Sequence, residues 1–409
     1  MPSRLGFLPF LLSLFPAVTP AQERTWTDKT GQNRVLAEFV DANGSQVWLK
    51  PVGGPTFSIP AEELSKADRD FVADLLRREK AQRKLAPADF PGSIGYGRPR
   101  ELATLASPRL DELSGMACSR RHGGLFWAHN DSGDEPRLYL FDLKGRDLGS
   151  CLLAGVRNFD WEDMASLEAG GKHYLLVADT GNNAVNAAVH MIHLIEEPPC
   201  DPNRGVLVEE VPVLKTIYFA FEDDFRNCEA MGIDPTDKSI LLVSKERRPA
   251  CCVYRLPWPK DEPFPPKHKE KPPEKALTAR LIGTLPLRQV TGMDVSPDGR
   301  RAIVLTYGDA YEYTRAAGED WSAAFARPPR LIELPPRVQG EAICYGPDGK
   351  TLYTSGENRP CPLIEVPLRA VNPQKSKASL PIRAGACRPG SSGPTRPGSD
   401  LSMLHCFPV

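Results

Sequence analysis

A fivefold internal repeat constrains the fold of this chain more than any other feature of its sequence. Each copy reads as a short strand, a turn containing Gly, Asp or Pro, a second strand and then a polar cluster. The copies are LSGMACSRRHGGLFWAHND, WEDMASLEAGGKHYLLVAD, CEAMGIDPTDKSILLVSKE, VTGMDVSPDGRRAIVLTYGD and GEAICYGPDGKTLYTSGEN. Self-similarity on this scale indicates structural units that bury their apolar faces against one another.

The repeat predicts a β-propeller over residues 100–370. More strand-like sequence follows each copy, which gives about four strands per unit, as in a propeller blade. The last unit lacks a fourth strand, and RELATLAS, Arg100–Ser107, can supply it and close the ring. Five blades is the prediction, and six is the alternative because two units carry insertions. The fold class is therefore all-β, with a smaller module in front of the propeller.

Acidic side chains recur where the units begin. The second residues of the quoted copies, here called the openers, are Ser114, Glu162, Glu229, Thr291 and Glu341. An innermost blade strand starts at the mouth of the central channel and the second strand returns to it, so openers and second-strand ends should converge there. The residues expected to contact a ligand at this mouth are Asp131, Asp163, Asp179, Lys245, Glu246, Asp309 and Glu357.

Two interpretations of the acidic mouth remain open. Carboxylates from several blades suit a hard cation such as Ca²⁺, with Glu162, Glu229 and Glu341 as its predicted ligands. Alternatively, the acids form salt bridges and hydrogen bonds that seal the channel. Asp163 differs from the openers, because its equivalents in the other units are Gly or Ala, and it is an addition peculiar to the second unit.

Residues 22–84 predict a small β-barrel closed by a helix. Two alternating stretches flank DANGS, a hairpin turn with a strong Asn-Gly signal, and a third short strand follows. Ser65 and Asp68 form a capping-box arrangement for a helix that runs to about Lys84. The segments WTDKTG, AEFV, VWLK and IPAEELSKADRDFV resemble SLA homology domain one, an SH3-like module. That resemblance implies a peptide or protein ligand, and a structural spacer is the alternative.

The remaining segments are a predicted signal, a linker and a tail. Residues 1–21 read as a secretory signal, with an uncleaved anchor as the alternative, so the mature protein is expected to be exported, periplasmic or extracellular. Residues 85–99 read as a linker and residues 371–409 as a disordered tail. No stretch after the signal could span a membrane. The net charge of −1 provides no basic field for nucleic acid or an anionic membrane.

A second resemblance concerns the propeller. ELSGMACSRRHGGLFWAHNDSGD, NFDWEDMA, ADTGNN, CEAM, VTGMDVSPDGRRAIVLTY and GEAI look like a family of exported bacterial propellers grouped with phytase-like or esterase-like proteins. The resemblance implies that Glu162, Glu229 and Glu341 hold Ca²⁺ that bridges to phosphate. No nucleophile constellation appears, so catalytic residues stay unassigned. The sequence thus favours a binding protein with an unidentified small-molecule ligand at the mouth, and a Ca²⁺-dependent phosphoester or other ester hydrolase is the alternative.

Overall fold

The computed structural model describes most of the two predicted modules. The described residues are 23–42, 46–51, 53–54, 57–82, 85, 94–247, 249–259, 276–335, 337, 339–357 and 359–369. The predicted signal, the predicted tail, the Asn-Gly turn and most of the predicted linker lie outside them. The chain up to Arg369 forms one compact unit. Among the described residues no helix is long and apolar enough to cross a membrane.

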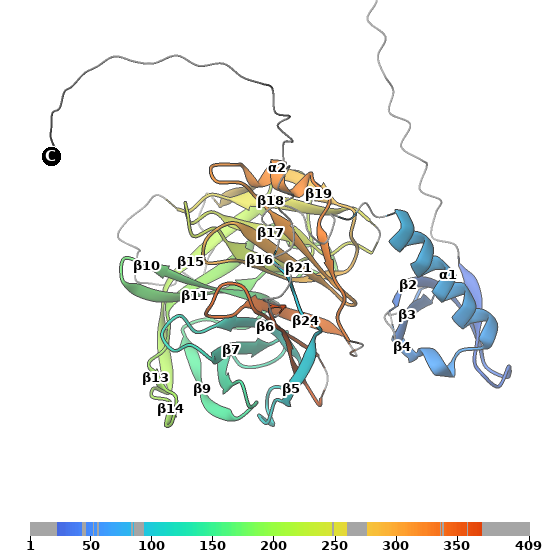
Figure 1. Cartoon of the computed structure of the whole chain (residues 1–409), viewed down its shortest axis with the longest axis horizontal. Coiled ribbons are helices and arrows are strands. Elements are labelled where there is room, and N and C mark those ends of the chain that lie inside the picture. Colours follow the sequence, from blue (N-terminus) through green and yellow to red (C-terminus); the bar gives the residue numbers. More distant parts are fainter. Residues whose placement is uncertain are drawn as a thin grey trace, which may run out of the picture. The chain divides into compact units, whose positions relative to one another are not determined.

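The N-terminal module is a four-stranded antiparallel sheet with a helix, as the sequence predicts (Figure 1). Its elements in chain order are β1 (Arg24–Thr27), β2 (Arg34–Ala42), β3 (Gln46–Pro51), β4 (Phe57–Pro60), the 3-10 helix η1 (Ala61–Glu63) and α1 (Lys66–Gln82). Trp26, Val47 and Leu49 are buried in its core. We refer to this module as the barrel.

The predicted capping box begins α1 and also ties the helix to the sheet. The Ser65 hydroxyl donates to Asp68 Oδ2 at 2.8 Å, and the Asp68 N–H donates to Ser65 Oγ at 3.2 Å. The same carboxylate accepts the Thr27 N–H at 2.9 Å and pairs with Arg24 at 2.6 Å. One buried carboxylate therefore fixes both the helix start and the first strand.

Five four-stranded antiparallel blades follow, in the order of the repeats. Blade 1 consists of β6 (Leu113–Cys118), β7 (Leu125–Asn130), β8 (Arg137–Asp142) and β9 (Asp147–Ala154). Blade 2 consists of β10 (Trp161–Ala169), β11 (Lys172–Asp179), β12 (His190–Glu196) and β15 (Glu210–Phe221). The insertion in blade 2 is a small hairpin, β13 (Cys200–Asp201) and β14 (Gly205–Val206), which projects from the propeller (Figure 1).

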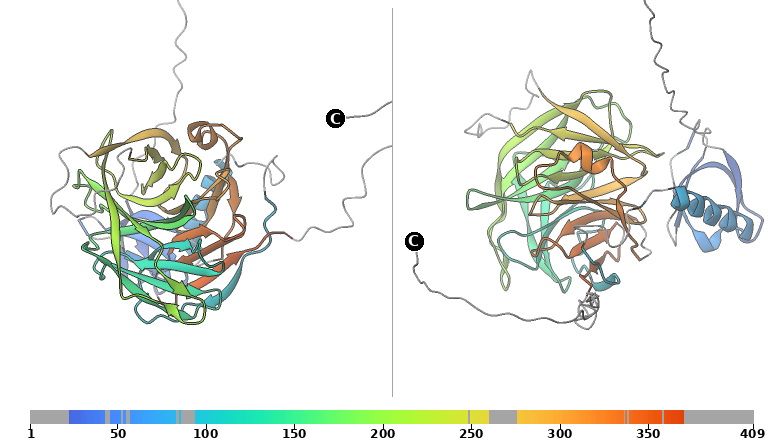
Figure 2. Two further views of the ribbon diagram at one scale, coloured as in Figure 1. Left: turned by 90° about the vertical axis from the view of Figure 1, so that its left-hand side faces the viewer. Right: turned by 45° about the horizontal axis from the view of Figure 1, so that its top comes forward.

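The other three blades repeat this arrangement (Figure 2). Blade 3 consists of β16 (Cys228–Ile233), β17 (Ile240–Ser244), β18 (Cys251–Leu256) and β19 (Leu277–Leu285). Blade 4 consists of β20 (Val290–Val295), β21 (Arg301–Thr306), β22 (Ala310–Thr314) and β23 (Arg330–Ile332), with helix α2 (Trp321–Phe325) before its last strand. Blade 5 consists of β24 (Gly340–Tyr345), β25 (Leu352–Gly356), β26 (Pro362–Val366) and β5 (Arg100–Thr104).

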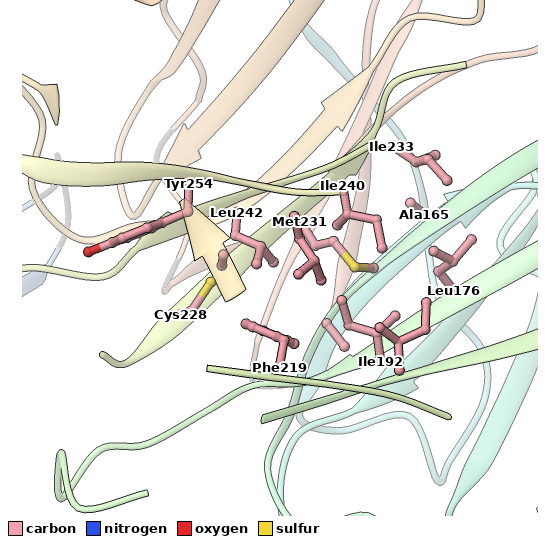
Figure 3. Close-up of a cluster of buried hydrophobic side chains, with 14 of the residues drawn as sticks. Ala165, Leu176, Ile192, Phe219, Cys228, Met231, Ile233, Ile240, Leu242 and Tyr254 are labelled. Carbon is pink, nitrogen blue, oxygen red and sulfur yellow. The ribbon is translucent and has the colours of Figure 1, made fainter. Parts of the chain in front are cut away.

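The ring closes through the strand that precedes the first repeat. β5 pairs antiparallel with β26, with Thr104 opposite Pro362, so blade 5 takes its outermost strand from the start of the propeller. Five separate apolar clusters fill the five blade interfaces, including the one between blades 5 and 1. Figure 3 shows the cluster between blades 2 and 3, in which Leu176 and Ile192 face Met231 and Ile240. The described residues thus form a closed five-bladed propeller.

Candidate functional site at the channel mouth

Each opener occupies a β-bulge at the start of its inner strand. The register between the first and second strands shifts at this point in all five blades, between Leu113 and Gly115 in blade 1 and at the equivalent positions elsewhere. A bulge re-aims a side chain and is common beside functional sites. The fivefold bulge therefore explains why openers from all five blades converge on one end of the channel.

The serine and threonine openers connect neighbouring blades. The Ser114 hydroxyl donates to the Glu162 carbonyl oxygen at 2.6 Å, and the Thr291 hydroxyl donates to the Gly340 carbonyl oxygen at 2.6 Å. Both hydroxyls thus bind the inner strand of the next blade. Of the five openers, only the three glutamates bring charged side chains to the mouth.

Three carboxyl groups on one side of the mouth lie close enough to share a metal ion. Oxygen atoms of Asp131, Asp160 and Glu162 all lie within 4.8 Å of one another. Asp131 follows β7, whereas Asp160 and Glu162 bracket the first residue of β10. A Cβ atom at Gly181 would overlap both Glu162 Oε1 and the Asp160 carboxyl group, so glycine at this position leaves room for them. We call these three residues the acidic triad.

Among the described residues the acidic triad has no ion-pair partner of its own, and Lys245, which pairs with Glu229, only partly offsets the charges of Glu162 and Asp131. Burial, together with the carboxylates of Glu229 and Asp131, raises the pKa of Glu162 well above its ordinary value. Burial and the neighbouring Asp131 and Glu229 raise the pKa of Asp160 to about 6. Burial also raises the pKa of Asp131. Burial, with repulsion between neighbouring carboxylates at Glu162 and Asp160, thus disfavours the charged forms, and a bound cation would offset this cost.

The other side of the mouth is organised around Lys245. Its ammonium group pairs with Glu229, which also accepts a hydrogen bond from Asn227 Nδ2 at 2.9 Å. Burial opposes the charge on Lys245, but Glu229, Tyr307, Glu341 and Glu162 outweigh it and raise its pKa. Glu341 accepts a hydrogen bond from the Gln339 side chain. Of the three predicted metal ligands, only Glu162 belongs to the acidic triad, whereas Glu229 and Glu341 have these other partners.

Three other residues predicted to contact a ligand hold loops in place. Asp179 accepts the Asp160 N–H at 3.0 Å, Glu246 accepts the Ser244 hydroxyl at 2.9 Å, and Asp309 accepts the Leu334 N–H at 3.1 Å. Asp179 thereby positions the loop that carries Asp160. Glu357 belongs to the mouth, because burial and the nearby Asp131 raise its pKa to about 7.

Asp163 has a different role from the ligand contact that the sequence predicts. Its carboxylate is fully buried and accepts three backbone N–H groups, from Met164 at 2.8 Å, Met231 at 2.8 Å and Met293 at 2.9 Å. These donors lie on the inner strands of blades 2, 3 and 4. Asp163 thus joins three blades across the channel, which explains a carboxylate where other units have Gly or Ala.

The sequence interpretation missed several residues of the mouth, above all Asp160, Tyr307 and Gln339. Asp160 lies two positions before Glu162, and side chains two apart in a strand share a face, so strand alternation could have identified it. Tyr307 was detectable only as part of the TYGD cluster. Gln339 likewise lies two positions before the opener Glu341, and its side chain donates a hydrogen bond to that residue.

Comparison with known proteins adds one family and one structural likeness. Residues 16–80 match the family model described as SLA1 homology domain 1, SHD1. The chain is 32% identical over 71 residues to the actin cytoskeleton-regulatory complex protein SLA1 of Mycosarcoma maydis, which is 17% of this chain but only 6% of that protein. The PQQ-bound aldose sugar dehydrogenase of Streptomyces coelicolor superposes with a TM-score of 0.42 at 10% identity, over 68% of this chain and 99% of that structure.

Proposed function

We propose that this chain is an exported two-module binding protein whose propeller binds a divalent cation, Ca²⁺ in the first place, at the channel mouth. The observation that carries the proposal is the acidic triad, whose oxygen atoms lie within 4.8 Å of one another beside a glycine. Oxygen ligands from flexible carboxylates suit Ca²⁺. Three protein side chains leave coordination positions that a small ligand or water can fill.

The charge distribution supports a ligand that binds through the cation. Two basic side chains lie beside the glutamates on the far side from the triad, Lys245, which pairs with Glu229, and Arg337, whose charge Asp309 and Glu341 favour. An anionic ligand at the triad itself would therefore meet negative charge without an ion-pair partner unless a cation bound first. Glu357, close to Asp131, and Glu341, close to Glu357, continue the acidic lining from the triad.

The first prediction is that Ca²⁺ stabilises the protein through the acidic triad. At a concentration 100 times the dissociation constant, a ligand that binds only the folded state stabilises it by about 2.7 kcal/mol. Asp160→Asn and Glu162→Gln should each abolish the rise in melting temperature, because each removes a charged ligand. Glu210→Gln, an exposed acid on β15, is the matched control and should keep the rise. Calorimetric titration of the full chain provides an independent measure of affinity.

The pH dependence of stability offers a second readout of the same site. The folded-state pKa of Asp160 is raised to about 6, so the folded protein without metal binds more protons than the unfolded chain between pH 4 and 6. Stability should therefore fall as pH rises through this window, and Ca²⁺ should reverse that slope. An unchanged melt with calcium and with chelator, at both ends of the window, would reject the metal site.

A second candidate function is Ca²⁺-dependent hydrolysis of phosphate or other esters. The observation that favours it is the pKa of Glu357, raised to about 7 by burial and Asp131, where a carboxyl group can act as a general acid or base. Calcium-dependent hydrolysis of p-nitrophenyl phosphate or acetate should then fall about 100-fold or more in Glu357→Gln. Rates that are equal in Glu357→Gln and Glu210→Gln, or unaffected by chelator, would leave binding as the function.

A further inference from the structure

Two aromatic rings and an ion pair connect the barrel to the rim of the channel mouth within the compact unit that ends at Arg369. The ring centroids of Trp48, on β3, and Tyr307 lie 5.0 Å apart, and Val40 completes a small buried cluster with them. Arg288 pairs with Asp41 at 3.0 Å, with both side chains 9% exposed. Its guanidinium group also lies 5.0 Å from the Phe39 ring.

The propeller side of this contact belongs to the mouth. Tyr307 directly follows β21, and Arg288 lies two residues before β20, so both lie at the end of blade 4 where its opener Thr291 lies. The Tyr307 ring lies 4.8 Å from Lys245 Nζ, and Lys245 pairs with Glu229. A continuous series of contacts therefore runs from Trp48 of the barrel through Tyr307 and Lys245 to the opener Glu229.

The barrel side is a surface separate from the barrel's own core. Trp48 and Val40 are absent from the apolar cluster around Trp26 and are buried together with Tyr307 instead. Trp, Tyr and Arg are the residue types that dominate binding energy at protein interfaces. We call Val40, Asp41 and Trp48 the docking face, and Phe39, which also packs against the barrel core, borders it.

We propose that the ligand of the docking face is the chain's own propeller, and that the docked barrel restricts access to the acidic mouth. The ion pair supplies specificity, and Val40, Trp48 and Tyr307 supply the buried apolar contact. Because Tyr307 contacts both Trp48 and Lys245, binding at the mouth and docking of the barrel are coupled. The restriction of access rests on the proposed function, whereas docking itself does not.

Hydrogen exchange of the full chain tests docking directly. Trp48→Ala removes an interface anchor worth about 2 kcal/mol, so the undocked state should be populated about 30-fold more. The amides around Tyr307 and along β3 should then exchange faster. Phe57→Ala, which removes an exposed aromatic from β4 of the same barrel, is the matched control and should leave exchange unchanged. Equal exchange in the two variants would overturn the docking proposal.

A charge swap distinguishes the loss of docking from a general loss of folding stability. Asp41→Arg and Arg288→Asp should each accelerate exchange in the same amides, and the double variant should restore slow exchange because the ion pair re-forms with reversed polarity. Failure of the double variant to recover would contradict the assigned pair.

Stopped-flow mixing with Ca²⁺ separates the two proposals. In undocked variants the association rate should rise several-fold if the barrel limits access to the triad. Faster exchange without any calcium signal, in either the parent or the variants, would reject the metal site and retain docking. A calcium signal with identical rates in the parent and Trp48→Ala would reject restricted access.

Discussion

Asp163→Ala is expected to lower the free energy of unfolding by about 4 kcal/mol, because it leaves three buried backbone N–H groups without an acceptor. An unsatisfied buried donor costs about 1 to 3 kcal/mol, and some relief comes from water entering the space left by the side chain. Since the three donors lie on different blades, the loss should also weaken the ring as a whole rather than one strand. Urea unfolding monitored by Trp fluorescence measures the effect.

The control for this prediction is an aspartate that accepts backbone N–H groups in a solvated turn. Asp348 accepts those of Lys350 at 2.9 Å and Thr351 at 2.8 Å, in the exposed turn after β24. Water can replace it there, so Asp348→Ala should cost about 1 kcal/mol or less. If the two variants lost equal stability, Asp163 would not be the residue that joins the blades.

The architecture was predictable because the same strand–turn–strand pattern occurs five times in the sequence. Each copy carries a largely apolar inner strand, a turn of Gly, Asp or Pro and a second strand, and only packing against similar neighbours can bury such strands. The closing role of Arg100–Thr104 followed from counting, since the fifth unit lacks one strand. Insertions did not add a blade, because the described one is the short β13–β14 hairpin.

The site was less predictable because it depends on bulges and on distances between blades. Strand alternation assigns residues to faces, but a bulge changes the face at the opener, and no letter in the sequence marks it. Glu162 and Asp163 are adjacent acids with different roles. Glu162 lines the mouth, whereas Asp163 accepts hydrogen bonds from backbone N–H groups of three blades. Which carboxylates lie close enough together to share a cation, and which one pairs with Lys245, is decided only by the folded ring.

Lys245→Met is expected to cause the second large decrease in the free energy of unfolding. The Lys245 and Glu229 side chains are 15% and 4% exposed, so removing the ammonium leaves a buried carboxylate without its partner and beside other acids. Breaking a buried pair in this way costs about 3 to 5 kcal/mol. Lys172→Met breaks a pair with Glu196 in which the side chains are 59% and 44% exposed, and exposed pairs contribute only about 0 to 1 kcal/mol. The two variants therefore differ in the burial of the pair they break.

The pH dependence of Lys245→Met identifies the cause of its instability. Without the ammonium, the pKa of Glu229, already raised by burial, should rise further, and protonation at low pH should neutralise the unpaired charge. The difference in unfolding free energy from the parent should therefore be smaller at pH 5 than at pH 7.5, measured by urea unfolding at both values. A loss that is the same at both pH values, or no greater than that of Lys172→Met, would mean that Lys245 does not hold the glutamate openers together.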